Sequence, residues 1–386
     1  MFIRANKYMP RKNFYKVCMI CGEEKVISSI LGICKDCILE RFDEAEQYIF
    51  DAHKKVRSQF NLPASPPKSP DGIRCNICSH NCSMGEGETS FCGLRWNDGG
   101  KLVTLSNALK APVYSYLDPH VTNCCAAWFC PASTGLGYPK WAVKKSTEHG
   151  YYNLAIFFYG CNFSCLFCQN WEHKLLGNAR YKTAKQLAEE VLANKRITCI
   201  CYFGGDPDVH LPYTINVNKL IIEGKGSRIV RICYEWNGDG NKILVKKAAE
   251  QVLETGGIIK FDLKAPNEKL YYALTGVKPK NVWDNFEMIY REFWHERPEV
   301  PILTATTLLV PGYIEVEEVE EIAKKIAEID PNIPYSLLVF HPDFKMDDLP
   351  ITTREVAKGA YEAAKKYLKN VNLGNMHLLS WALEKL

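Results

Sequence analysis

The stretch NLAIFFYGCNFSCLFCQN (residues 153–170) places a short apolar run directly before three closely spaced cysteines. The run over residues 153–160 is typical of a buried strand. Cys161, Cys165 and Cys168 then follow on one expected loop, with three and two residues between them. A structural zinc site normally takes four protein ligands, whereas three thiolates on a cluster of four irons leave one iron open. The spacing therefore indicates a loop that could hold an open iron–sulfur cluster.

Strand and helix patterns alternate after this loop. Five more apolar runs are expected to form strands, at residues 197–205, 229–237, 257–264, 302–311 and 333–342. Between them lie amphipathic helical patterns, one beginning at Thr183 with a capping-box sequence and another beginning at Thr352. Such alternation is typical of a parallel sheet, and five or six units are too few for a closed eight-stranded barrel. The sequence thus predicts an α/β fold, a partial (β/α)6 TIM-like barrel over residues 151–386.

The residues before the barrel divide into three expected parts. Residues 1–59 are predicted to form a zinc-ribbon-like metal-knuckle module, with a helix whose apolar face repeats from Ile38 to Val56. Residues 60–73 contain four prolines and are typical of a semi-rigid linker. Residues 74–150 form a second cysteine-rich segment, for which an auxiliary metal site is expected.

The chain has 386 residues and 17 cysteines. It shows no secretory signal and no apolar run near the ~18 residues of a membrane span, so a cytoplasmic location without a membrane is expected. Because the cytosol is reducing, metal binding explains so many cysteines better than disulfides do. The expected setting is an anaerobic cell.

The net charge of +4 is too small to indicate a nucleic-acid-binding protein. The first 17 residues nevertheless carry only basic charges, at Arg4, Lys7, Arg11, Lys12 and Lys16. This could be an arm for RNA or an acidic partner protein, but a solvated, frayed terminus explains it more simply.

Two cysteine sets have four members each. Cys18, Cys21, Cys34 and Cys37 form paired C-x2-C knuckles, which suit structural zinc or a rubredoxin-like iron. Zinc, mononuclear iron and an auxiliary 4Fe-4S cluster all fit the second set, which consists of Cys75, Cys78, Cys82 and Cys92.

Six cysteines remain outside these sets. Metal ligation, a redox role and simple packing stay open for Cys124, Cys125 and Cys130. Core positions within predicted strands are expected for Cys199, Cys201 and Cys233.

The three-cysteine loop, with Phe167 before the last cysteine, resembles the motif of the radical S-adenosylmethionine (SAM) superfamily. The resemblance implies that the open iron of a 4Fe-4S cluster chelates SAM. Reductive cleavage would then yield a 5′-deoxyadenosyl radical that abstracts hydrogen from a substrate.

Motifs at later strand ends strengthen the resemblance. Gly204, Gly205 and Asp206 stand where the superfamily has a GGE-type motif for the methionine amino group, with Asp in place of the commoner Glu. Asn237 ends the third strand, where ribose contacts are expected. Asp262 and Lys264 match a D-x-K pattern of the pyruvate formate-lyase activating enzyme group. Pro311-Gly312, at the end of the fifth predicted strand, also resembles the sequence of that group.

A narrower resemblance covers residues ~75–380 but not the first ~70. The motif Cys168-Gln-Asn-Trp171 and the sequence GGDP at residues 204–207 are similar to motifs of uncharacterised relatives of pyruvate formate-lyase activating enzyme. These include radical enzymes encoded beside AMMECR1-like and Memo-like proteins, which the resemblance suggests as partners.

The leading hypothesis is a radical SAM oxidoreductase-type enzyme that acts on a protein or peptide in the manner of an activase. It would need a low-potential electron donor of the ferredoxin or flavodoxin type. One alternative is radical modification of a small molecule or RNA, and another is a non-catalytic iron–sulfur or zinc protein.

Overall fold

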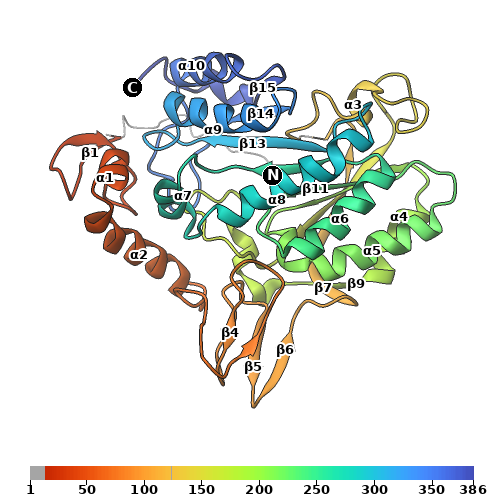
Figure 1. The fold of residues 1–386 in the computed structure, drawn as a ribbon, viewed down its shortest axis with the longest axis horizontal. Coiled ribbons are helices and arrows are strands. Elements are labelled where there is room, and N and C mark those ends of the chain that lie inside the picture. The colour runs from red at the N-terminus through yellow and green to blue at the C-terminus, as the bar shows by residue number, and fades with distance from the viewer. Residues whose placement is uncertain (1–13, 123) are drawn as a thin grey trace.

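Seven parallel strands form the centre of the sheet in the part of the chain that the structure describes. The structure is a computed structural model, and it describes residues 14–122 and 124–386 (Figure 1). Neighbouring parallel strands pair in chain order, as β8 (Tyr152–Phe158), β10 (Ile197–Phe203), β11 (Arg231–Trp236), β12 (Ile259–Asp262), β13 (Leu303–Leu309), β14 (Tyr335–Val339) and β15 (Val371–Gly374).

Two antiparallel strands extend this sheet beyond β8. β7 (Lys110–Pro119) pairs with β8, and β9 (Tyr181–Thr183) pairs with β7. All six predicted strands are present, and the predicted α/β partial-barrel class is confirmed. The sequence analysis did not predict β7, β9 and β15, because β9 and β15 are short and β7 contains two prolines.

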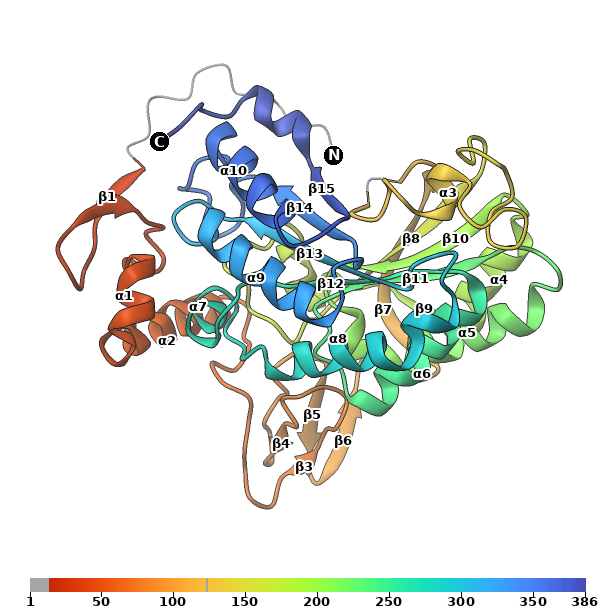
Figure 2. The ribbon, with the colours of Figure 1, turned by 45° about the horizontal axis from the view of Figure 1, so that its top comes forward.

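Amphipathic helices cover the outer face of the sheet (Figures 1 and 2). They are α4 (Ala184–Ala193), α5 (Leu211–Gly224), α6 (Lys242–Thr255), α8 (Lys280–Phe293), α9 (Val316–Ile329) and α10 (Arg354–Lys365). The capping box expected at Thr183 is formed, with Gln186 as its partner. α10 is capped by Thr353 and not by Thr352, whose hydroxyl instead donates to the Leu309 carbonyl.

The N-terminal residues form a small hairpin followed by two helices. β1 (Tyr15–Val17) pairs with β2 (Glu24–Val26), and α1 (Lys35–Glu40) and α2 (Phe42–Ser58) follow. The helix predicted over residues 38–56 is therefore broken at Arg41, which has the non-helical backbone angles φ −123° and ψ 46°. The predicted basic residues Arg4, Lys7, Arg11 and Lys12 lie outside the described residues, whereas the ammonium of Lys16 pairs with Asp348 at 3.1 Å.

This N-terminal part packs closely on the barrel (Figure 2). The ammonium of Lys269 in α7 (Glu268–Thr275) donates to the Leu39 carbonyl at 2.6 Å. The Val26 carbonyl approaches Gly312 so closely that a Cβ there would lie 2.2 Å from its oxygen. The Pro311-Gly312 turn, which the sequence analysis grouped with cofactor motifs, is thus a docking point for the N-terminal hairpin.

Residues 60–109 form two hairpins with their flanking loops, and a long irregular segment follows β7 up to residue 151. β3 (Ile73–Arg74) pairs with β4 (Ser83–Met84), and β5 (Arg95–Asp98) pairs with β6 (Lys101–Thr104). Both hairpins project from one edge of the molecule (Figure 1). The irregular segment contains α3 (Pro131–Thr134) and is tied to the sheet by a buried ion pair, in which Arg231 Nη2 lies 2.6 Å from Glu148 Oε2.

No helix in the described ranges is long and apolar enough to cross a membrane.

Candidate active site and metal centres

A cavity of about 440 Å³ opens at the C-terminal ends of the parallel strands. Side chains from β7, β8 and β10 to β14 all line it, so the sheet curves around it. The structure brings every residue of the predicted cluster and cofactor set to this wall, namely Cys161, Cys165, Phe167, Cys168, Gly204, Gly205, Asp206, Asn237, Asp262 and Lys264.

The cysteine loop leaves β8 and is held by backbone hydrogen bonds to the end of α7. The Ser164 amide donates to the Thr275 carbonyl at 2.8 Å, and the Leu166 amide donates to the Leu274 carbonyl at 3.1 Å. Within the described part of the chain, the three cysteine Sγ atoms do not all lie within 4.8 Å of one another. This wide spacing fits a cluster, because each cysteine then binds a different iron.

Two lysines supply positive charge near the three thiols. Burial raises the pKa of each thiol, that of Cys165 to about 12, while attraction to Lys174 opposes this rise at all three. Lys264 acts in the same direction on Cys165 and Cys168. Lys174 is 4% exposed and lies on a short 3-10 helix after the motif. The sequence analysis missed it, since nothing in its local pattern marks it as buried.

The loop of Gly204 and Gly205 is locked against the start of the cysteine loop. The Phe158 amide donates to the Gly204 carbonyl at 2.7 Å, and the Asp206 amide donates to the Gly160 carbonyl at 3.2 Å. Gly205 has φ +59°, and a Cβ there would lie 2.3 Å from the Phe158 oxygen. Only glycine fits this position, because both the backbone angle and the space exclude a side chain.

Asp206 connects two strand ends through its buried carboxylate. One oxygen accepts from the Asp208 amide at 3.0 Å, and the other contacts the Asn237 side-chain amide. That same amide lies 3.7 Å from Cys161 Sγ. Burial raises the pKa of Asp206 to about 6. The short aspartate thus holds Asn237 beside the first cysteine, although both residues also line the cavity.

Asp262 and Lys264 form an ion pair on the wall of the same cavity. The Lys264 side chain is buried, and its ammonium lies 6.0 Å from the centre of the Phe167 ring. Attraction to Asp262, with a further contribution from Cys165, raises the pKa of Lys264 and keeps it protonated. A fixed positive charge therefore stands beside the second cysteine.

A row of aromatic rings runs from the molecular surface into the cavity. Tyr114 and Tyr116 on β7 are 55% and 41% exposed, and their ring centres lie 6.0 Å apart. Tyr116 stacks on Phe157, which stacks on Phe203 at 5.4 Å. Tyr116, Phe157 and Phe203 all line the cavity. These rings form an apolar entrance that the sequence analysis did not assign to the site.

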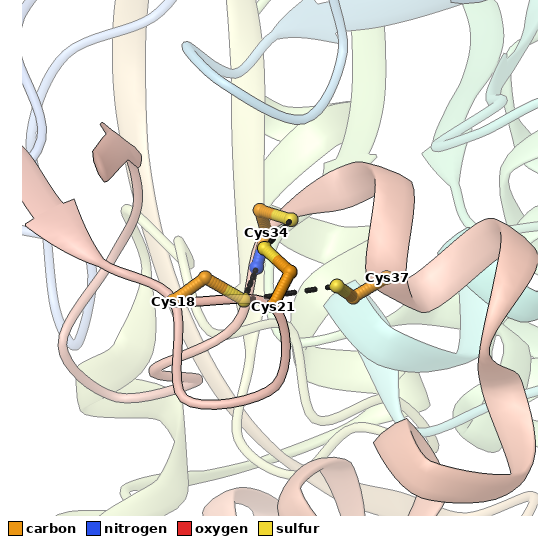
Figure 3. A group of neighbouring side chains, drawn as sticks. All are labelled: Cys18, Cys21, Cys34 and Cys37. Atoms are coloured by element: carbon orange, nitrogen blue, oxygen red, sulfur yellow. Dashed lines mark hydrogen bonds between the residues drawn. The ribbon is translucent and has the colours of Figure 1, made fainter. Parts of the chain in front are cut away.

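The first four-cysteine set converges on one point (Figure 3). Cys18 and Cys21 come from the turn after β1, whereas Cys34 and Cys37 come from the start of α1. The Sγ–Sγ distances are 3.8 Å for Cys18–Cys37 and 3.9 Å for Cys21–Cys34. Tetrahedral zinc with bonds of about 2.3 Å places its sulfurs about 3.8 Å apart, so this geometry fits a single ion.

The second four-cysteine set gathers beside the cysteine loop. Burial raises the pKa of Cys75, Cys78 and Cys82, and repulsion from Cys92 adds to each rise, so the four thiols share one neighbourhood. Among the described residues, no three of these sulfurs lie within 4.8 Å of one another, a wide spacing for a single ion. His80, between two members, bonds through Nε2 to the Asn162 carbonyl at 2.7 Å.

Buried Arg57 lies between the second set and the cysteine loop. Its charge interacts with Cys161 of the loop and with Cys82 and Cys92. Its guanidinium donates to the Phe91 carbonyl and covers the Phe91 ring at 3.4 Å. Sequence reasoning missed Arg57, because an arginine on an amphipathic helix normally faces solvent.

Comparison with known proteins gives a family match for one part of the chain. Residues 155–326 match the model of the radical SAM superfamily. An uncharacterised protein of Methanocaldococcus jannaschii is 25% identical over 321 residues, 79% of this chain and 81% of that protein. A second protein of this organism, provisionally named a glycyl-radical enzyme activating enzyme, is 28% identical over 55% of this chain and 77% of its own length.

A third relative, the isethionate sulfite-lyase activating enzyme of Desulfovibrio desulfuricans, is 26% identical over 36% of this chain and 40% of that enzyme. The resemblance to activating enzymes that the motifs indicated is thereby confirmed. The stretch that matches the radical SAM superfamily model, residues 155–326, carries the cysteine loop and most of the cavity wall.

Proposed function

We propose that this chain is a radical SAM enzyme that abstracts hydrogen from a protein or peptide. Cys161, Cys165 and Cys168 would hold a 4Fe-4S cluster. The glycine loop, Asp206, Asn237, Asp262 and Lys264 would hold SAM. One observation carries the proposal, which is that all of these residues line a single cavity at the ends of successive parallel strands.

The residues present fit the two groups. Two buried thiols, Cys161 and Cys165, and the partly buried thiol of Cys168, without a fourth protein ligand, suit a cluster with one open iron. Lys174 and Lys264 offset part of the negative charge that such a cluster and its thiolates carry. When reduced, the bound cluster would supply the electron that cleaves a C–S bond of SAM. The chain's own part is to bury the thiols and to let the ligand approach the backbone at Gly204 and Gly205.

Two observations support a protein or peptide substrate. Relatives with significant similarity are named as activating enzymes, one of them for a glycyl-radical enzyme, which is itself a protein. The exposed Tyr114 and Tyr116 also offer flat apolar surface at the cavity entrance. Tyrosines of this kind are common anchors for polypeptide partners.

The two four-cysteine sets would have different roles. A zinc ion at Cys18, Cys21, Cys34 and Cys37 would brace the N-terminal part, which is too small for a core of its own and whose buried residues join the core of the barrel. An auxiliary cluster suits the more widely spaced Cys75, Cys78, Cys82 and Cys92 better than one ion does. Electrons would come from a donor of the ferredoxin or flavodoxin type. Partnership with AMMECR1-like and Memo-like proteins stays a prediction.

The reaction can be tested on the full chain. After anaerobic cluster reconstitution, dithionite and SAM should yield 5′-deoxyadenosine, and Cys165→Ala should abolish it. Cys199→Ala is the matched control, because Cys199 is a buried strand cysteine outside the cavity wall. Absence of product from a wild-type chain with full iron content would refute the enzyme proposal. Product from Cys165→Ala would refute the site assignment.

The substrate class needs a separate measurement. The reconstituted enzyme is incubated with protein, RNA or small-molecule fractions from cells grown in deuterated medium. Deuterium should enter 5′-deoxyadenosine only with the protein fraction. Deuterium transfer confined to the RNA or small-molecule fraction would overturn the protein-substrate proposal while leaving the radical chemistry in place.

A further inference from the structure

Two adjacent cysteines meet a strand carboxylate in the interior of the partial barrel. Cys124 and Cys125 lie on the irregular segment after β7, and Glu235 lies on β11. One ligand atom from each of the three residues lies within 4.8 Å of both others. Apart from the N-terminal four-cysteine set, no other group of three or more His, Cys, Asp or Glu in the described ranges is this compact.

Contacts with the sheet fix this part of the segment. The Cys125 carbonyl accepts from the Ser336 hydroxyl of β14 at 2.6 Å and from the Trp128 indole at 3.1 Å. The indole also donates to Ser336 Oγ at 3.0 Å. Because β14 and β11 are separate strands of the rigid sheet, Cys125 and Glu235 are held in register.

The Glu235 carboxylate lacks a partner in the structure. Its Oε2 is buried and accepts no hydrogen bond from the described residues. A buried carboxylate oxygen without a donor is costly, since it has lost water and gained nothing in return. A cation at this point would satisfy it.

A buried lysine completes the charge balance. Lys260 on β12 is 2% exposed, its Nζ lies 3.2 Å from Cys201 Sγ, and within the described residues it forms no ion pair with a carboxylate. A divalent ion together with this ammonium carries three positive charges, which two thiolates and one carboxylate neutralise.

We propose that Cys124, Cys125 and Glu235 bind a zinc ion in the barrel interior. Two thiolates with one carboxylate suit a borderline-soft ion and not magnesium or calcium, which take oxygen ligands. Three protein ligands leave the fourth tetrahedral position for water or another small ligand. A neighbouring cavity of about 40 Å³, lined by Cys124 and Lys260 among others, has room for one water.

The location links this ion to the proposed active site. Glu235 also lines the large cavity, so the zinc would share a wall with the space for substrate. The proposal goes beyond the radical chemistry, because it concerns separate residues and does not require SAM to bind.

Metal analysis of the full chain tests the inference. Zinc and iron per chain are measured by mass spectrometry in protein purified with zinc and dialysed against a mild chelator. Cys125→Ser and the nearly isosteric Glu235→Gln should each lose one equivalent of zinc relative to wild type, with iron unchanged. Cys130→Ser is the matched control, since Cys130 lies on the same segment but contacts Ser133 instead.

The outcomes separate the alternatives. Zinc content equal to wild type in both Cys125→Ser and Glu235→Gln would overturn the proposal. An equal zinc loss in Cys130→Ser would also overturn it, by showing that disturbance of the segment and not ligand removal is responsible. Replacement of zinc by cobalt should give thiolate-to-cobalt absorption that weakens in Cys125→Ser and persists in Cys130→Ser. Neither readout depends on turnover, so a failed radical assay leaves this test intact.

Discussion

Replacement of Gly205 by alanine should damage both stability and activity, and Gly226→Ala separates the causes. The two glycines have nearly equal backbone angles, φ +59° and φ +57°. Alanine in this left-handed region costs about 1–2 kcal/mol at either position. A Cβ at Gly226 would meet no atom within 4 Å, whereas one at Gly205 would lie 2.3 Å from the Phe158 oxygen. Only the Gly205 variant must therefore move its loop.

That movement would break two hydrogen bonds, from the Phe158 amide to Gly204 and from the Asp206 amide to Gly160. Each is worth about 1 kcal/mol, so Gly205→Ala should lose about 3–4 kcal/mol of unfolding free energy and Gly226→Ala about 1–2 kcal/mol. Displacing the loop by about 1 Å should also slow 5′-deoxyadenosine formation ~100-fold. Denaturant unfolding and product assays measure both effects. Equal losses in the two variants, or wild-type activity in Gly205→Ala, would refute this reasoning.

Three further outcomes are expected. Lys174→Met should lower the cluster's reduction potential by tens of millivolts, since a tenfold change in a one-electron equilibrium corresponds to ~59 mV, and Lys174→Arg should restore the potential. The potential is measured by a redox titration followed by electron paramagnetic resonance. An unchanged potential would contradict the placement of this charge. Cys37→Ser should lose one equivalent of zinc, and its unfolding temperature in calorimetry should fall by a few degrees, because the N-terminal part docks on the barrel. A zinc content equal to that of the wild type would show that this four-cysteine set binds no zinc. Arg231 holds the pKa of Glu148 below its usual value, so this pair stabilises the fold above the unfolded-state pKa, near ~4.3, and the stabilisation fades as pH falls through the folded-state pKa. Glu148→Gln should therefore be about 3–5 kcal/mol less stable at neutral pH, with a gap that narrows in acid; a gap that does not change with pH would count against the assignment.

Local sequence patterns determined most of the barrel. Each of the six predicted parallel strands is a short apolar run, because such strands are covered on both faces and need little polar alternation. The cysteine loop was equally readable, since its three thiols lie within one short segment. Motifs at later strand ends could be expected to meet, because the carboxyl ends of parallel strands share one edge of the sheet. This reasoning explains why all ten residues predicted for the cluster and cofactor line one cavity.

Burial and charge at single positions could not be predicted in this way. Lys174 and Arg57 look like ordinary surface residues in the sequence, but the tertiary structure encloses both beside buried thiols. The break at Arg41 was also missed, because the apolar spacing continues across it. At these positions packing by distant segments overrides the local preference.

The sequence by itself therefore determined the fold class, the cysteine loop and the order of motifs along the strands, because these depend on residues close together in the chain. Only the tertiary structure decided which distant groups meet. It brings Cys124 and Cys125 into contact with Glu235. It also places the second four-cysteine set beside Asn162 and makes Pro311-Gly312 a docking point for the N-terminal hairpin. Spacing along a chain carries no information on such meetings, since they arise when loops cross the curved sheet and pack against its strands.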